Sequence, residues 1–470
     1  MAHVRLFKHY FHLPFILLGL IDLVVLAASC SLAVFFRFFG DAAFFSEHFA
    51  IVFPSLVVFS FINLTVMMAL GVYQASVEEG MSGMMLRTIM ALMLAIPVHG
   101  FAYFVASDWL WYLGSFDLLS SATVLSVFCL GIARVLFFGV LGKERFKRRV
   151  VVLGAGRRAK RLLQDLTTPF NRKGFTLDGF IPMPDENVEV SEEHLINMPC
   201  SLHQYVIRHP VREIVIAVDD RRRGLPMDDL LECKMAGVSI IDGINFYERE
   251  SRKVALEMLT RGWLVFSDGY TFSAVYGMGK RALDIITAVA LLVFTFPIML
   301  LTALAIKIED GFSAPVVYSQ ERVGVHNRVF RVYKFRSMVT DAEKDGAVWA
   351  KQNDSRVTKV GDFIRRVRID ELPQIFNVLN GSMSFVGPRP ERPIFVERLT
   401  NKIPFYAERH RVKPGLTGWA QLCFAYADNE EDTREKLRYD LYYIKNQSLL
   451  LDLLIVLQTV EVVLFKKGSR

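Results

Sequence analysis

Cysteine is scarce in this sequence, and the cysteines that are present form no pattern. The five are scattered with none at the spacing of metal ligands, which excludes a zinc-ribbon type of site and is typical of a reducing cytosol. Motifs for nucleic-acid binding are also lacking, so the net charge of +7 indicates an anionic membrane face or an anionic nucleotide substrate as the partner, with no nucleic acid. We expect no cleavable signal peptide, because the first apolar run is too long and lacks a small-residue cleavage site.

Long apolar runs are plentiful by contrast, since 52% of the residues are hydrophobic. Runs at 14–36, 48–73, 84–106 and 116–141 are each long enough to span a bilayer, and they predict a four-helix transmembrane bundle over residues 1–142. Basic residues gather before the first run and after the fourth, so the positive-inside rule places both ends in the cytoplasm. Asp22 and Arg134 lie inside the first and fourth runs, where they are either functional or paired or snorkelling.

A glycine-containing turn comes next. A strand-like run at 148–153, then Gly154 and Gly156, then a helix with apolar periodicity are typical of the opening of a βαβ unit. With further strand-like runs at 175–181, 213–218 and 238–241, this pattern predicts a Rossmann-like domain over 143–262. Dinucleotide binding needs an acid at the end of the second strand, where the sequence has Pro182-Met183-Pro184. We therefore favour a non-catalytic domain with a regulatory or assembly role.

Aromatic residues are interleaved with polar ones between 251 and 279, which is typical of a membrane interface and equally of ordinary core packing; they are Trp263, Phe266, Tyr270, Phe272 and Tyr276. An apolar segment at 282–306 follows, with Pro297 inside it and basic residues at both ends. A full span would place the domains before and after it on opposite sides of the membrane. We therefore expect a re-entrant helix broken at Pro297, with an ordinary transmembrane helix as the alternative.

The most informative stretch is 365–392. Asp370 and Glu371 precede an apolar run at helical spacing (Leu372, Ile375, Phe376, Leu379), while Pro373 fits only a first helical turn and Gly381 is placed to end the helix. A helix N-terminus keeps a carboxylate ionised and attracts phosphate. With Arg365 before the acids and Arg389 after them, the stretch suits phosphoryl transfer through an aspartyl phosphate. The alternative is that Asp370 is only an N-cap and the arginines a solvated face.

Other charged residues are ambiguous when taken one at a time. Strand-like segments carry Arg322, Lys334 and Arg336, and the segment His410–Gln421 carries Lys413 beside the loop glycines Gly415 and Gly418; each cation is either surface charge or a ligand for phosphate. Asp341 and Glu343 are candidate acidic ligands of lower rank. The apolar tail at 448–465 is interrupted by Asp452 and Glu461, so we expect an interfacial amphipathic helix rather than a span.

The order D-E-L-P-Q-x-x-N-V-L-x-G-x-M-S-x-V-G-P-R-P, present as Asp370–Pro390, resembles the monotopic polyprenyl-phosphate sugar-1-phosphate transferases. The segments at 280–307, 315–338, 410–421 and 440–446 are similar to that family as well, although Lys413 stands where the family commonly has arginine. The resemblance implies a mixed α/β, mainly helical, monotopic catalytic domain at 263–470 with a re-entrant membrane helix. It implies Asp370 as nucleophile, Glu371 as a Mg²⁺ ligand, and Arg365 and Arg389 as phosphate-binding residues. It also favours contacts of Arg322, Lys334, Arg336 and Lys413 with phosphate or lipid headgroup.

The implied reaction transfers a sugar 1-phosphate from a UDP-sugar to undecaprenyl phosphate and releases UMP, as the first step of exopolysaccharide, capsule or O-antigen synthesis. The implied place is the bacterial inner membrane, with the catalytic domain facing the cytoplasm. The sequence leaves undecided whether the protein forms a homodimer. Larger members of the family carry a Rossmann-like module between the membrane bundle and the catalytic domain. Two other classes are weighed against this one: a membrane-anchored nucleotide-sugar oxidoreductase or dehydratase, for which a Tyr-x-x-x-Lys pair is missing, and a non-enzymatic scaffold, for which retained Asp370, Glu371 and Arg389 are unexpected.

Overall fold

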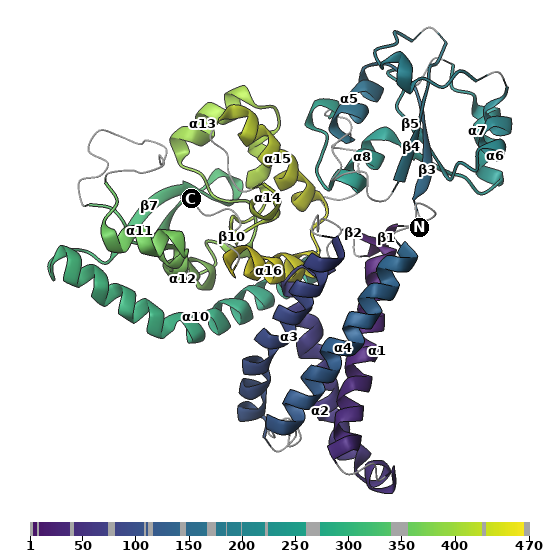
Figure 1. Ribbon diagram of the computed structural model, residues 1–470. Helices are drawn as coiled ribbons and strands as arrows, with labels where there is room; N and C mark the ends of the chain where they lie inside the picture. Colours follow the sequence, from purple (N-terminus) through teal and green to yellow (C-terminus); the bar gives the residue numbers. More distant parts are fainter. Residues whose placement is uncertain are drawn as a thin grey trace. The chain divides into compact units, whose positions relative to one another are not determined.

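The computed structural model describes residues 3–6, 9–37, 42–73, 80–107, 110, 116–141, 147–166, 175–184, 186–198, 200–220, 224–259, 273–339, 356–424 and 429–464 (Figure 1). The chain forms two compact units, one of Met1–Leu6 with Tyr10–Leu259 and one of Phe7–His9 with Thr260–Arg470. The predicted boundary after residue 262 lies outside the described residues. So do the candidate ligands Asp341 and Glu343 and four of the five interleaved aromatic residues, Tyr276 being the exception.

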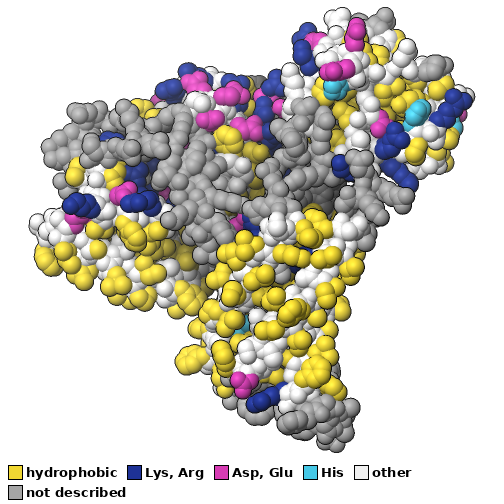
Figure 2. Space-filling view, in the orientation of Figure 1, with side chains coloured by type: hydrophobic (Ala, Val, Ile, Leu, Met, Phe, Trp, Pro, Cys, Tyr) yellow, Lys and Arg dark blue, Asp and Glu magenta, His cyan; other side chains and the backbone are white. Residues whose placement is uncertain are grey.

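The first unit begins with a two-stranded sheet and four long helices. The elements are β1 (His3–Leu6), β2 (His9–His12), α1 (Leu13–Arg37), α2 (Ala42–Ala69), α3 (Gly80–Val105) and α4 (Phe116–Leu141). Helix α1 packs against α2 and α4, and α3 packs against the same two helices. All four are long and apolar enough to cross a membrane, and hydrophobic side chains cover their outward faces in Figure 2. The predicted apolar helices of the N-terminal region are therefore confirmed.

An ion pair lies in the middle of this bundle. Both guanidinium Nη atoms of Arg134 donate to the carboxylate oxygens of Asp22 at 2.8 Å, and both side chains are fully buried. The hydroxyl of Tyr73 donates to Asp22 Oδ2 at 2.5 Å. Of the alternatives for Asp22 and Arg134, pairing between helices is the one that the structure shows; neither side chain snorkels. A paired, hydrogen-bonded arrangement is what a charge inside an apolar bundle requires.

A parallel α/β layer follows the bundle in the chain. Its elements are β3 (Arg148–Leu153), α5 (Arg157–Leu166), β4 (Phe175–Ile181), α6 (Leu202–Arg208), β5 (Glu213–Ile216), α7 (Met227–Met235), β6 (Ser239–Asp242) and α8 (Gly243–Ser251). The sheet order is β4-β3-β5-β6, with every pair parallel. Helices α5 and α8 cover one face of the sheet, and α6 and α7 cover the other (Figure 1).

The predicted parallel α/β domain is thus confirmed, whereas its Rossmann-like type stays a prediction. Its first strand, β3, lies between the second and third strands, which is the 2-1-3-4 order of flavodoxin-like folds; dinucleotide-binding folds have the order 3-2-1-4. The carboxyl ends of β3 and β5 flank the point where the order reverses, which is where such sheets place their loops for ligands.

The second unit combines one long apolar helix with short strands and many helices. Its elements are α10 (Ala274–Asp310), β7 (Val317–Val323), β8 (Val329–Phe335), α11 (Lys359–Arg366), the 3₁₀ turn η6 (Ile369–Gln374), α12 (Ile375–Leu379), β9 (Ser384–Val386), α13 (Pro393–Lys402), η7 (Tyr406–Arg411), β10 (Gly415–Thr417), α14 (Trp419–Cys423), α15 (Glu430–Lys445) and α16 (Leu449–Leu464). Strands β7 and β8 form an antiparallel ribbon, and β9 pairs with β10 in parallel. Gly387 and Gly415 allow that second pairing, because a Cβ on Gly415 would lie 2.1 Å from the Gly387 nitrogen.

Helix α10 differs from its prediction. It runs as one helix through Pro297 and extends from Ala274 to Asp310 rather than over 282–306. Figure 1 shows it as a curved ribbon, since a helix can bend around the one hydrogen bond that proline removes. The predicted break in the helical backbone is therefore wrong, while the re-entrant course of the helix in a membrane stays a prediction. Its outward side chains are mostly apolar and exposed, as Figure 2 shows along its lower face.

Helix α16 presents its charged residues inward. Asp452 and Glu461 are buried, whereas the exposed side chains of the helix are Leu449, Leu453 and Val460. An amphipathic helix is expected to carry these acids on a polar outer face. The structure places them on the inward face instead. They lie inside because α16 packs against α10, which supplies polar partners for Asp452.

Candidate functional site

The two neighbouring acids lie at the start of a short helical stretch, as predicted. Asp370 and Glu371 belong to the first turn of η6, which leads directly into α12. The turn has three residues per revolution, so the two side chains point about 120° apart rather than the roughly 100° of an α-helix. Pro373 lies in the second turn of η6, just before α12, and Gly381, at φ 84°, follows the end of α12.

The inward face of this stretch differs from the predicted apolar pattern. Phe376 is 47% exposed, and Asn377 occupies the buried position beside it. Asn377 accepts a hydrogen bond from the Tyr333 nitrogen at 3.1 Å and donates to the Arg331 carbonyl oxygen at 2.8 Å. A buried amide can bind strand β8 in this way while an aromatic ring cannot, so Asn377 fixes the acid-bearing stretch against the strand that carries Lys334.

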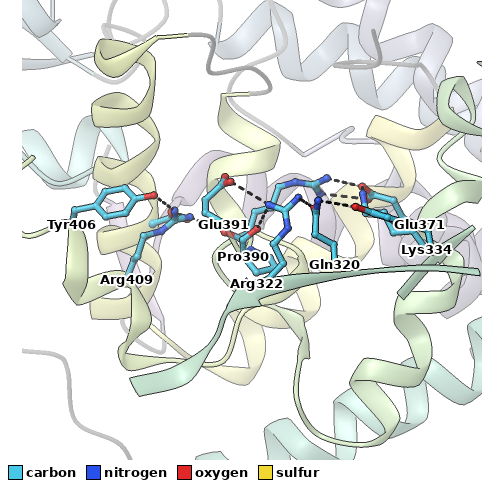
Figure 3. Close-up of polar contacts among 11 residues, drawn as sticks. Gln320, Arg322, Lys334, Glu371, Pro390, Glu391, Tyr406 and Arg409 are labelled. Atoms are coloured by element: carbon cyan, nitrogen blue, oxygen red, sulfur yellow. Dashed lines mark hydrogen bonds and ion pairs between the residues drawn. The ribbon is translucent and has the colours of Figure 1, made fainter. Parts of the chain in front are cut away.

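Glu371 is surrounded by cations. Lys334 Nζ donates to its Oε1 at 2.8 Å, and Arg389 donates through Nη2 to Oε1 at 2.6 Å and through Nη1 to Oε2 at 3.4 Å (Figure 3). Burial raises the pKa of the Glu371 carboxyl, but the charges of Arg389 and Lys334 hold that pKa well below its usual range. Glu371 is therefore an anion whose two oxygens are both engaged.

Asp370 is in a different environment although it is the next residue. It is 8% exposed, and within the described part of the chain its salt-bridge contact is with Lys334 Nζ, at 4.0 Å. Burial raises the pKa of Asp370, the charge of Lys334 opposes that rise, and the neighbouring Glu371 adds to it. The site thus holds one carboxylate tied by short ionic hydrogen bonds and a second, similarly buried one whose contact with Lys334 is longer.

The turn that carries Arg389 is held from two sides. Arg322 donates through Nη1 to the Pro390 carbonyl at 3.0 Å and to Glu391 Oε2 at 3.3 Å. Arg409 donates through Nη2 to the Arg389 carbonyl at 3.0 Å and pairs with Asp440 at 2.8 Å. In Figure 3, Arg409 lies beside Tyr406 on one side of Arg322 and Glu391, and Glu371 lies with Lys334 on the other side. Sequence reasoning missed Arg409, whose only signal was its place just before the segment His410–Gln421.

The first turns of α10 contact the end of α12 and strand β9 within the motif. Arg281 donates through Nη1 and Nη2 to the carbonyls of Val378 and Leu379, the last two residues of α12, at 2.6 and 2.7 Å. Asp284 accepts from the Ser384 hydroxyl at 2.9 Å and from the Phe385 nitrogen at 2.8 Å, both in β9. Helix α10 is therefore part of the frame that positions the acids and the turn after β9.

Lys280 adds a third contact of α10 to the same frame. Its Nζ donates to the Val386 carbonyl at 3.0 Å and to Asp452 Oδ2 at 3.1 Å. Tyr443 donates to the other oxygen of Asp452 at 2.6 Å, and Tyr276 donates to Oδ2 at 2.9 Å. The cations at the start of α10 thus bind protein atoms in this structure.

The remaining predicted cations occupy three different places. Arg365 is close enough for its charge to lower the pKa of Asp370, and Arg336 pairs with Asp310 at 2.5 Å. Lys413 lies at the opposite end of α12 from the acids, since a Cβ on Gly381 would lie 3.6 Å from its Nζ. Burial lowers the pKa of Lys413, and the charges of Arg281 and Lys280 lower it further. The structure therefore assembles Asp370, Glu371, Lys334, Arg389 and Arg365, with Arg322 behind them and Lys413 apart.

A metal ion would have to be shared with a substrate. Among the described residues no group of three or more His, Cys, Asp or Glu side chains could hold a metal. Asp370 and Glu371 supply two carboxylates, which fits Mg²⁺, since that ion is commonly held by one or two carboxylates together with phosphate oxygens and water. Both oxygens of Glu371 already accept hydrogen bonds from cations, so a metal would compete with Lys334 and Arg389.

The glycine turn of the α/β domain binds its own side chains. The backbone nitrogens of Arg157 and Arg158 donate to the two oxygens of Asp219, each at 3.0 Å, and the Ala155 nitrogen donates to Glu186 Oε2 at 2.8 Å. A Cβ on Gly156 would lie 2.5 Å from Asp219 Oδ2, so the carboxylate approaches as closely as a phosphate would. These are the donors that a dinucleotide needs, and their occupation speaks against the dinucleotide interpretation.

Comparison with known proteins relates the second unit to a family of sugar transferases. The family model described as bacterial sugar transferase matches residues 275–466. The chain is 51% identical over 198 residues to the Aeromonas hydrophila UDP-N-acetylgalactosamine-undecaprenyl-phosphate N-acetylgalactosaminephosphotransferase, covering 42% of this chain and 46% of that one. It is 42% identical over 196 residues to the Komagataeibacter xylinus undecaprenyl-phosphate glucose phosphotransferase, covering 40% and 36%. It is 41% identical over 183 residues to the Caulobacter vibrioides UDP-glucose:undecaprenyl-phosphate glucose-1-phosphate transferase, covering 38% and 68%. The first two similarities thus span less than half of each relative.

Proposed function

Because the chain belongs to the bacterial sugar transferase family, we propose that it transfers a sugar 1-phosphate from a UDP-sugar to undecaprenyl phosphate and releases UMP. The observation that carries this proposal is the asymmetric acid pair. A buried Asp370 lies beside an anionic Glu371, and Lys334 and Arg389 beside them could donate hydrogen bonds to phosphate oxygens. This set would supply a nucleophile and its counter-charges at one site.

The proposed chemistry has two displacements. A carboxylate oxygen of Asp370 attacks the phosphorus that bears the sugar, the bond to UMP breaks, and UMP leaves with the electron pair. A phosphate oxygen of the lipid then attacks the same phosphorus, and the bond to Asp370 breaks to restore the carboxylate. Arg389 and Lys334 stabilise the charge that spreads over the phosphoryl oxygens, because a guanidinium and an ammonium beside a low-dielectric site act without reorganisation. Arg365 lies close enough to contribute to the same field.

Magnesium belongs to the same proposal. Glu371 would hold Mg²⁺ together with phosphate oxygens, and the ion would neutralise part of the diphosphate charge. Binding of the ion at Glu371 requires Lys334 or Arg389 to move from Glu371 to the phosphate. Transfer should therefore stop with EDTA and return with added Mg²⁺. Full activity in EDTA would exclude the metal.

The cellular setting is proposed on the same grounds. Helix α10 would enter and leave the bacterial inner membrane on the cytoplasmic side, where UDP-sugars are found, and the first-unit bundle would span the membrane. The reaction would begin exopolysaccharide, capsule or O-antigen synthesis. The α/β domain would be a Rossmann-like module with a regulatory or assembly role, with a homodimer as one form of that assembly.

The deciding experiment is an assay of UMP release from a panel of UDP-sugars with undecaprenyl phosphate, using the full chain in detergent or nanodiscs. One sugar should support release that depends on the lipid, and Asp370→Asn should abolish it while the protein stays folded, since an amide cannot form the phosphate ester. Substantial turnover by Asp370→Asn would exclude Asp370 as nucleophile. No release with any sugar would contradict the proposed function.

A further inference from the structure

Arg336 is a buried cation with unused donors. It is 6% exposed, and its Nη2 donates to Asp310 Oδ2 at 2.5 Å. Within the described part of the chain, its Nε and Nη1 atoms have no hydrogen-bond partner. A guanidinium that only tied β8 to α10 would leave two of its three nitrogens unsatisfied, which is unfavourable in a buried place. A bound anion would supply the missing acceptors.

The position of Arg336 is between the membrane helix and the acid pair. Its partner Asp310 is the last residue of α10, and the exposed side chains around that end include the apolar Ile308 and Phe312 beside the charged Glu309. Arg336 directly follows β8, and its nitrogen donates to the Val316 carbonyl at 2.9 Å, which continues the pairing of the ribbon. Arg336 is two residues from Lys334, so in extended chain both side chains point to the same face, roughly 7 Å apart. Lys334 in turn contacts Asp370 and Glu371.

Arg365 offers an unused donor on the side of Asp370. Its Nη1 is buried and has no hydrogen-bond partner among the described residues. It extends from α11, whose first residues are bound to the end of α10, because Glu309 accepts hydrogen bonds from the Lys359 and Val360 nitrogens at 2.8 and 3.0 Å. Among the described residues, cationic donors without a partner therefore lie both beside the end of α10, on Arg336, and near Asp370, on Arg365.

We propose that Arg336 binds the phosphate of the polyprenyl phosphate acceptor, the substrate that reaches the site from the bilayer. The inference rests on the proposed function and assigns the acceptor subsite within it. The isoprenoid chain would lie along the apolar surface near the end of α10, and the phosphate would lie against Arg336, with Arg365 toward Asp370. From there an acceptor oxygen forms a bond to the phosphorus of the aspartyl-phosphosugar as the bond to Asp370 breaks. Lys334 and Arg389 remain with the donor phosphates.

The two half-reactions separate this assignment from other roles. Exchange of labelled UMP into the UDP-sugar without lipid reports the donor half, and the KM for undecaprenyl phosphate reports the acceptor half. Arg336→Lys keeps a charge beside Asp310 but loses guanidinium donors, so we expect the acceptor KM to rise about ten- to a hundredfold while UMP exchange changes by less than about twofold. Arg331→Lys, on an exposed side chain of the same strand, is the matched control and should leave both unchanged.

Three results would overturn the assignment: an Arg336→Lys variant with a normal acceptor KM, one with slowed exchange and a normal acceptor KM, or a control with the same defect. If Arg336→Lys is poorly folded by thermal unfolding, the double variant Arg336→Gln/Asp310→Asn removes both charges and is measured instead. Binding of undecaprenyl phosphate without UDP-sugar, followed by native mass spectrometry in nanodiscs, tests the contact independently of turnover. It should weaken in Arg336→Lys, and equal binding would contradict the assignment. A parent protein that binds the lipid but shows no transfer would contradict the proposed function instead.

Discussion

Replacing Arg281 by lysine tests whether the start of α10 positions the acid pair. Helix α12 has only five residues, so the carbonyls at its end have no partner within the helix. Arg281 donates to the Leu379 carbonyl at 2.7 Å and to the Val378 carbonyl at 2.6 Å, and the Val378 carbonyl also accepts from the Gly381 nitrogen at 3.1 Å. A lysine keeps the charge but not the fork, and we expect one of the two hydrogen bonds to be lost.

The expected magnitude follows from that single bond. A hydrogen bond from a charged group contributes about 1.5–3 kcal/mol, so the free energy of unfolding of the second unit should fall by about that amount. If the same free energy is lost from the transition state because η6 and its acids shift, kcat should fall by about ten- to a hundredfold. Thermal unfolding in detergent and UMP release at saturating substrates measure the two effects. Arg398→Lys, on an exposed residue paired with Glu430, is the control and should change neither.

This variant also separates two roles of the same cation. If Arg281 acted only as a positive charge that keeps the segment on the cytoplasmic side, lysine would replace it fully. Normal stability and normal kcat in Arg281→Lys would therefore refute the positioning role and leave the topological one. An equal defect in Arg398→Lys would show that the assay responds to any loss of guanidinium.

Three further predictions concern the acid pair, the glycine turn and the membrane helix. Burial raises the pKa of Asp370 and Lys334 opposes that rise, so Lys334→Met should move the acid limb of the pH–rate profile for UMP exchange to higher pH; a limb that moves to lower pH would contradict this. Asp219→Asn removes the charge at the start of α5, so it should lower the free energy of unfolding of the α/β domain by about 1 kcal/mol without changing UMP release. Millimolar NADH should not raise the melting temperature of the parent protein, and such a rise would favour dinucleotide binding again. Pro297→Leu should straighten α10 and expose some of a probe cysteine placed after Lys307 to labelling from outside, with activity falling in proportion; a parent already labelled from outside would show that α10 is an ordinary span.

The acid-bearing turn could be predicted because its information is local. Asp370 and Glu371 are adjacent, a proline fixes the first turn, and a glycine follows its end, so propensity and position agree without any knowledge of the rest of the chain. Local sequence alone could not place Lys334 and Arg389 next to Glu371, because their approach depends on how β8 and the turn after β9 pack. Their assignment came from the motif, and the geometry that joins them came from the structure.

What could not be predicted depends on packing between elements far apart in sequence. Arg281 contacts the Val378 carbonyl, 97 residues further along the chain, and Asp452 contacts Lys280, 172 residues before it. No local pattern in the sequence encodes such contacts. Phe376 stood at an apolar position of the helix and is exposed, since a buried amide at Asn377 binds strand β8 better than a ring does. Asp452 was read as a polar interruption and is instead the acceptor for Lys280, Tyr276 and Tyr443.

The attachment of α10 to the motif limits how this protein could be made water-soluble. Deleting the helix would also delete Lys280, Arg281 and Asp284, and with them the groups that complete α12 and β9. A truncated protein should therefore lose its active site even where it stays in solution. A soluble version would need the opposite treatment, in which the outward side chains of α10 are exchanged for polar ones and the inward charged residues are kept. Helix α10 is in this respect part of the framework of the site, with apolar side chains on its outward surface.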